Sequence, residues 1–186
     1  MAAEKDILST FNNEWLGALG EIKKWDEKKA KMEEVVAAAD TPKLANGDYS
    51  ALFDSLKKMA GDSHAAVSGS GINAIGALAK GLRKGFKDHA KQAVPVLFGK
   101  LKEKRLVNDI LTCLDNIMLC VELADLIEFL PQIDKETAPA SKLNILVFLE
   151  RAILVTYIDM LEDIKDQICC PPVMKVIEAK DPAGRD

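Results

Sequence analysis

The chain has 186 residues, of which 48% are hydrophobic, 29% charged and only 5% aromatic, and its formal net charge is −4. The acidic balance argues against a nucleic-acid-binding domain, which is usually basic, and the scarcity of aromatic residues disfavours a β-sandwich or barrel. No stretch reaches the roughly 18 uncharged apolar residues of a membrane span, and the charged N-terminal segment is unlike a secretory signal. We therefore expect one cytosolic domain over residues 1–186.

Apolar residues recur at helical spacing along most of the chain, and strand-like alternation is nowhere sustained. Asp48 is expected to start one helix and Gly85 to end another, while Pro95 bends a third. Two adjacent prolines interrupt the last helical segment. The pattern predicts an all-α protein with helices over 22–35, 47–61, 64–84, 89–104, 106–120, 121–133, 141–155 and about 158–179.

The predicted helices form pairs joined by short turns. The first helices of successive pairs begin near residues 47, 88, 121 and 158, a period of about 35 to 40 residues that is typical of α-solenoids of the HEAT and armadillo kind. Stacked pairs place their internal turns along one edge. These turns are expected at 61–66, 102–107, 134–142 and 179–186, with Trp25 and its neighbouring lysines at an earlier equivalent turn.

Neither the cysteines nor the glycines indicate chemistry. Cys113 and Cys120 share a helix face with apolar residues, which suits small buried hydrophobes, and the histidines lie far from any cysteine. A zinc site and other cofactors are therefore not expected. The stretch "GSGINA" (69–74) fits a dinucleotide-binding pattern, but it lies inside a helical period without a preceding strand. Its glycines are expected to let helices pack closely, and the protein is not expected to be an enzyme.

Several stretches carry a family resemblance through their order and spacing: "DILS" (6–9), "KKWDEKKAKMEEV" (23–35), "TPKLANGDYSALFDSLKKM" (41–59), "LAKGLRKGF" (78–86), "VPVLFGKLKEKR" (94–105) and "DPAGRD" (181–186). The chain resembles a TOG domain, and most of all the second TOG domain of the XMAP/Stu/Dis-type microtubule polymerases. The resemblance is close over 6–119, loose over 120–178, and weak over 181–186. It implies a HEAT-repeat solenoid of about five helix pairs, the last one incomplete.

The resemblance also implies that the turn edge binds the curved αβ-tubulin dimer. The family's tryptophan corresponds to Trp25, and Asp26 stands where the family usually has a cation. The implied domain is monomeric, lies within a polypeptide of several TOG domains, and acts on cytoplasmic microtubules at spindle poles or centrosomes. Residues that match the family's tubulin contacts are Trp25, Lys28, Ser63, His64, Lys102, Lys104, Arg105, Lys142 and Arg185.

Physical arguments favour this edge, although alternatives stay open. A row of cations would attract an acidic partner, and an exposed tryptophan is the residue type that dominates many interfaces. Conversely, Trp25 could be a packing residue, as expected of Trp15, and cations at helix ends are often merely solvated. The alternative function is a HEAT-type scaffold with weak or no tubulin affinity that binds another protein.

Overall fold

The computed structural model describes residues 4–179, and this part of the chain is helical. Its only β pairing is an isolated bridge between Lys5 and Leu44. No helix within this range is long and apolar enough to cross a membrane. In chain order the elements are α1 (Asn13–Glu21), α2 (Trp25–Ala39), α3 (Ser50–Ala60), α4 (Ala65–Leu82), η1 (Arg83–Phe86), α5 (Lys87–Lys100), α6 (Val107–Ile117), η2 (Leu123–Asp125), η3 (Ile127–Lys135), α7 (Pro139–Leu154), α8 (Ile158–Ile168) and α9 (Pro171–Ile177).

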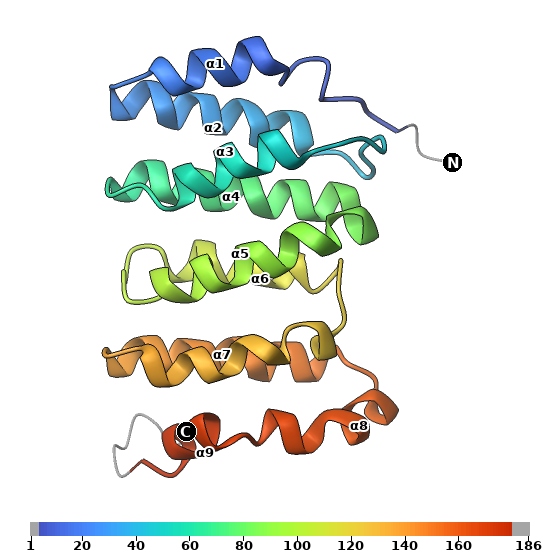
Figure 1. Cartoon of the computed structure of the whole chain (residues 1–186), viewed down its shortest axis with the longest axis vertical. Coiled ribbons are helices and arrows are strands. Elements are labelled where there is room, and N and C mark those ends of the chain that lie inside the picture. The colour runs from blue at the N-terminus through green and yellow to red at the C-terminus, as the bar shows by residue number, and fades with distance from the viewer. Residues whose placement is uncertain (1–3, 180–186) are drawn as a thin grey trace.

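The helices stack in layers, which confirms the predicted all-α solenoid (Figure 1). Antiparallel pairs are formed by α1 with α2, α3 with α4, α5 with α6, and η3 with α7, and α8 and α9 follow one another along the last layer. The turns within pairs lie along one edge, at the left of Figure 1, and we call residues 22–24, 61–64, 101–106 and 136–138 the turn edge. The links between pairs lie along the opposite edge, the connection edge, at residues 40–49, 83–86, 118–126 and 155–157.

The helix α4 is the centre of the stack, since it contacts α2, α3 and α6. Two of its glycines allow close approach. A Cβ atom at Gly71 would lie 2.6 Å from the backbone nitrogen of Ala60, and one at Gly76 would lie 3.3 Å from the Cα atom of Cys113. The prediction that glycines in 69–74 serve helix packing is therefore confirmed at Gly71, within a helix rather than a phosphate-binding loop.

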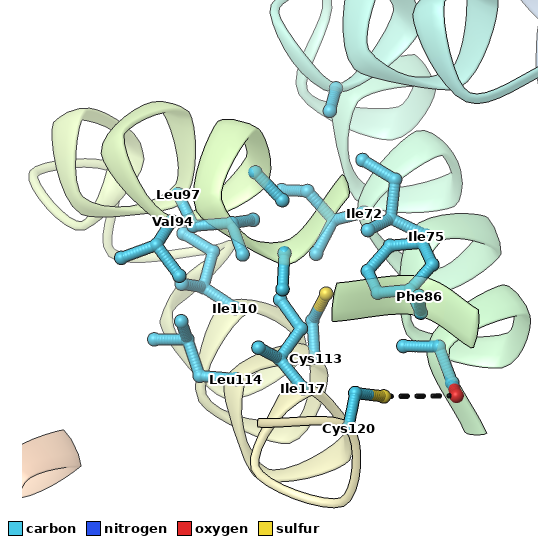
Figure 2. Close-up of a cluster of buried hydrophobic side chains, with 14 of the residues drawn as sticks. Ile72, Ile75, Phe86, Val94, Leu97, Ile110, Cys113, Leu114, Ile117 and Cys120 are labelled. Carbon is cyan, nitrogen blue, oxygen red and sulfur yellow. Dashed lines mark hydrogen bonds between the residues drawn. The ribbon is translucent and has the colours of Figure 1, made fainter. Parts of the chain in front are cut away.

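The core runs continuously through the layers, and Figure 2 shows the part where α4, η1, α5 and α6 meet. Cys113 and Cys120 are buried there, and the Cys120 thiol donates a hydrogen bond to the carbonyl oxygen of Ala79 at 3.1 Å. Burial raises the pKa of Cys113 well above its ordinary value and that of Cys120 to about 12. Both thiols therefore stay protonated, and their predicted role as small buried hydrophobes is confirmed.

Several predicted helix boundaries differ from the structure by a few residues, and two of these differences have a clear local cause. The helix α3 begins at Ser50 with Tyr49 as its N-cap residue, while Asp48 accepts the backbone N–H of Ser50 at 3.0 Å from just outside. The helix α4 ends at Leu82 rather than at Gly85, because the chain turns at Arg83, whose φ of 53° departs from helical geometry. The segment then continues as η1, which contains Gly85.

The predicted α-helix over 121–133 was wrong, because this segment forms the 3-10 helices η2 and η3. Glu122 and Asp125 cap η2 reciprocally, so that Asp125 accepts the backbone N–H of Glu122 at 3.2 Å. Pro131 lies inside η3 and has no N–H, so an α-helix there would lose one bond of its ladder. The apolar side chains still face the core, because Leu123, Leu130 and Ile133 are buried.

Candidate functional site

The predicted contact residues that the structure describes lie in the turn edge or in the first turns of the helices that adjoin it. Trp25 is the first residue of α2, His64 is the N-cap residue of α4, and Lys142 lies near the start of α7. Lys28 lies within the first turns of α2. Arg185 lies outside the residues that the structure describes. The other predicted residues on this edge are Ser63, Lys102, Lys104 and Arg105, all in turns and all exposed.

Trp25 is held in place while half of its surface stays open. Its indole stacks on the His64 ring, with centroids 4.5 Å apart and an angle of 16° between the planes, and the side chain remains 50% exposed. Trp15 differs, because it is half-buried, donates from Nε1 to Glu34 at 3.1 Å and packs edge-on against Phe11. Trp15 is therefore the packing residue that was expected, whereas Trp25 presents apolar surface to solvent.

Asp62 joins its own turn to the helices α2 and α5. Its Oδ1 atom accepts the backbone N–H of His64 at 2.8 Å, and its Oδ2 atom accepts from Lys28 Nζ at 3.2 Å. Its main-chain oxygen accepts from Lys100 Nζ, at 3.0 Å, at the end of α5. The His64 N–H bond and the Lys28 ammonium hold the pKa of Asp62 below its ordinary value, against the effect of partial burial. Asp62 thus fixes the register of the edge.

This arrangement changes the role of Lys28. Its side chain is only 23% exposed, and its charge is neutralised by Asp62, whose side chain is 16% exposed. An ion pair of this kind, partly removed from water, positions its partners more than it attracts a distant ligand. Lys28 therefore joins α2 to the turn before α4, rather than standing as a free cation on the surface.

The free positive charge gathers at the third turn. Lys102, Lys104 and Arg105 are exposed, and none forms an ion pair with another residue of the described range 4–179. The turn is anchored by its buried ends, Leu101 and Leu106. Lys100, which directly precedes this turn in the sequence, instead forms an ion pair with Glu103 at 2.9 Å.

The start of α7, which follows the fourth turn, is hydrogen-bonded to the third turn. Asn144 Nδ2, in α7, donates to the carbonyl oxygen of Leu101 at 3.4 Å. Lys142 is partly buried and makes no ion pair within the described part of the chain. Among residues 4–179 no group of three or more His, Cys, Asp or Glu side chains is placed to hold a metal ion. The arrangement is suited to binding an acidic protein surface, through one aromatic anchor and a cluster of cations.

Comparisons with known proteins place this chain in a family. Protein MOR1 of Arabidopsis thaliana is 38% identical over 130 residues, which cover 68% of this chain and 7% of MOR1. Protein mini spindles of Drosophila melanogaster is 31% identical over 185 residues, which cover 97% of this chain and 9% of that protein. A solved structure from work on microtubule plus end tracking by XMAP215, CLIP-170 and EB1 superposes with a TM-score of 0.82 at 28% identity, over 99% of this chain and 78% of that one.

The chain is a TOG domain of the XMAP215, MOR1 and mini spindles family. No family model matches it. A second solved structure, from work on tubulin recruitment by microtubule polymerases with TOG domain arrays, shares the fold with a TM-score of 0.85 at 20% identity, over 98% of this chain and 40% of that chain. This TOG domain spans less than a tenth of the length of the curated relatives MOR1 and mini spindles.

Sequence reasoning missed the links that hold the TOG domain's turn edge together. Neither the helical period nor the family resemblance indicated that Lys100 and Asp62 join neighbouring layers. A signal was present in the spacing, because the bonds Lys28 to Asp62, Lys100 to Asp62 and Asn144 to Leu101 join residues 34, 38 and 43 positions apart. These sequence separations are close to the length of one repeat, about 35 to 40 residues. Complementary polar pairs at that distance therefore indicate bonds between neighbouring layers.

Proposed function

We propose that this TOG domain binds αβ-tubulin dimers through its turn edge, without catalysis, and serves a microtubule-associated protein that promotes microtubule growth. The single observation that carries the proposal is the gathering of a half-exposed Trp25 and the exposed cations Lys102, Lys104 and Arg105 along one edge of the stack. The structural relatives come from work on tubulin recruitment and microtubule plus end tracking, which supports the choice of partner.

Trp25 is the apolar anchor in this proposal. Its ring plane is set before binding by the stack on His64, so little side-chain freedom remains to be lost when it enters a pocket. Aromatic anchors of this kind typically contribute about 2 kcal/mol or more to binding when truncated to alanine. Ser63 and His64 would contact the partner beside Trp25.

The cations supply attraction and orientation. Lys102, Lys104 and Arg105 are free to pair with carboxylates of an acidic partner, and such contacts raise association rates and weaken as salt increases. Lys142 extends this positive region to the next layer, and Arg185 would continue it. Lys28 contributes by holding the second turn through Asp62.

The names of the relatives support a proposal for the wider setting. Names such as mini spindles and centrosomal protein 224, the latter 30% identical over 155 residues in Dictyostelium discoideum, support action on cytoplasmic microtubules at spindle poles or centrosomes. We place this domain closest to a second TOG domain, as one monomeric unit over 1–186 among several in a polypeptide. Linked domains would raise the effective concentration of tubulin at a microtubule end.

A second function is favoured by two features of the first turn. Lys28 is neutralised, and the exposed carboxylate of Asp26 lies beside the Trp25 anchor. Both features reduce the attraction of the first turn for an acidic partner. The alternative is a HEAT-type scaffold with weak tubulin affinity that binds another protein.

Gel filtration with αβ-tubulin separates the two functions. The wild-type domain should shift tubulin to an earlier elution volume at low salt, and less so at about 150 mM salt, where screening is stronger. Reversing the charges of Lys102, Lys104 and Arg105 to Glu should abolish the shift. The matched control is Lys84→Glu, which changes an exposed lysine on the connection edge. A wild-type domain that never shifts tubulin at low salt would favour the scaffold.

A further inference from the structure

The connection edge carries an exposed apolar patch that the tubulin proposal does not use. Seven large hydrophobic side chains are exposed in the part of the chain that the structure describes, and four of them lie at the junction of α7 and α8. We call these four the apolar step: Leu154, Val155, Tyr157 and Ile158, which are 69% to 81% exposed. Single exposed hydrophobic residues are ordinary, but a contiguous group in a connection is typical of an interaction site.

The apolar step borders a formed hollow. A cavity of about 220 Å³ lies between the α6–η3 connection and the α7–α8 connection, and Val155 and Tyr157 form part of its wall. Its other apolar lining residues include Met118, Val121 and Met160. A neighbouring hollow of about 260 Å³ shares Val121 and Glu122 with the first and includes Leu119, another exposed hydrophobic side chain. Its remaining wall is more polar and contains Lys84 and the ion pair of Lys87 with Asp125. The edge is therefore grooved, and an apolar side chain from a partner would find walls on several sides.

A row of carboxylates runs beside this groove. Asp159, Asp163 and Asp166 recur at positions i, i+4 and i+7 of α8, which places them along one stripe of the helix. They are exposed, and none makes an ion pair within residues 4–179. The stripe lies next to the one formed by Met160 and Ile164, which line the hollow. An occupant of the groove would therefore meet unpaired negative charge along one side.

We propose that this groove binds a basic amphipathic helix supplied by a partner protein. Apolar side chains on one face of such a helix would enter the hollow against the apolar step, and lysines or arginines on its flank would pair with the stripe of Asp159, Asp163 and Asp166. The stripe spans about 10 Å of α8 at 1.5 Å per residue, which matches two turns of a partner helix. Because the groove lies opposite the turn edge, this partner and tubulin could be bound together.

A second copy of the domain is a poorer occupant. In a two-fold pair the same surface faces itself, so the carboxylate stripes would be brought towards each other. Like charges across an interface disfavour association. The charge pattern of the groove therefore selects a positively charged partner over self-association.

The test is a peptide titration that is monitored through amide NMR spectra of the isotopically labelled domain. The probe is a synthetic peptide of about 14 residues with leucines on one helical face and lysines on the other. We expect shift changes confined to residues 118–124 and 154–166, with affinity that falls as salt rises. The control peptide carries glutamate in place of lysine and should not bind.

Variants separate the two contributions. Tyr157→Ser combined with Ile158→Ser should weaken binding at least tenfold, and Asp159→Asn combined with Asp163→Asn about fivefold. All four side chains are exposed, and the NMR spectrum of each variant reports directly whether it is folded. Trp25→Ala, on the opposite edge, should bind the peptide like the wild type.

Three results would overturn the proposal. The glutamate peptide could bind as well as the lysine peptide, the shift changes could lie outside the groove, or neither peptide could bind. Sedimentation of the free domain tests whether a second copy of the domain occupies the groove instead. A dimer that the Tyr157 and Ile158 double variant abolishes would assign the groove to a second copy and also contradict the proposal.

Discussion

Replacing Gly71 with alanine tests the close packing on which the geometry of the stack depends. The new Cβ atom would lie 2.6 Å from the backbone nitrogen of Ala60 and 2.8 Å from the carbonyl carbon of Met59, whereas ordinary contact begins near 3.4 Å. The obstructing atoms are backbone, so the end of α3 would have to retreat from α4 by about 0.8 Å. The turn that follows α3 carries Asp62 and His64, so this displacement would also disturb the turn edge.

The magnitude of the Gly71→Ala effect follows from two opposing terms. Overpacking of a rigid site costs about 3 kcal/mol, at the upper end of the usual range, because no flexible side chain can yield. Alanine in place of glycine inside a helix returns about 1 kcal/mol. The free energy of unfolding should therefore fall by about 2 kcal/mol, which lowers the melting temperature by roughly 4 to 8 °C in a domain of this size.

Thermal unfolding followed by circular dichroism measures this effect, and Gly17→Ala provides the control. Gly17 lies in the middle of α1, and a Cβ atom there would meet nothing within 4 Å. That variant should gain about 1 kcal/mol from helix propensity alone and melt a few degrees higher. If Gly71→Ala melted at or above the wild-type temperature, the close approach of α3 and α4 would be wrong.

Two further predictions concern titratable groups. Asp62→Asn should lower the free energy of unfolding, measured by urea titration, by about 1 kcal/mol at pH 7. Because the folded-state pKa of Asp62 is depressed, this difference between wild type and variant should shrink as the pH falls through that folded pKa. A difference that persists at low pH would show that the charge of Asp62 is not its cause. In thiol titrations at about pH 8, the exposed Cys169 should react in the native domain, whereas Cys113 and Cys120 should react only after unfolding, since burial raises their pKa values. Rapid reaction of either buried thiol in the native domain would contradict its placement in the core.

The sequence predicted most of the helices because their stability comes from one-sided apolar faces. The predicted segment 47–61 corresponds to α3 within a few residues, since Leu52 and Leu56 repeat on the face that is buried against the stack. The same spacing of apolar residues over 121–133 is compatible with 3-10 geometry, which also buries one face. Apolar periodicity therefore located this buried segment correctly and assigned its helix type wrongly.

The site was predictable in outline and not in its internal bonds. A repeat of about 35 to 40 residues brings successive turns to one edge, which is enough to bring Trp25 and the third turn onto a common surface. The pairing of Lys28 with Asp62 depends on how α2 is rotated and shifted relative to α3 and α4. That relation is set by side-chain packing between layers, such as the contact at Gly71, and no local pattern reports it.

The most direct test of the account is the dissociation constant of the αβ-tubulin complex for Trp25→Ala at low salt, measured beside the wild type and Trp15→Phe. Loss of the indole should weaken binding about 30-fold, equivalent to about 2 kcal/mol, because Trp25 is the anchor of the turn edge. Trp15→Phe should bind tubulin as the wild type does, since Trp15 packs within the stack and contacts Phe11. Equal affinity of Trp25→Ala and the wild type would contradict the account, and would make Trp25 a surface residue without a role in binding.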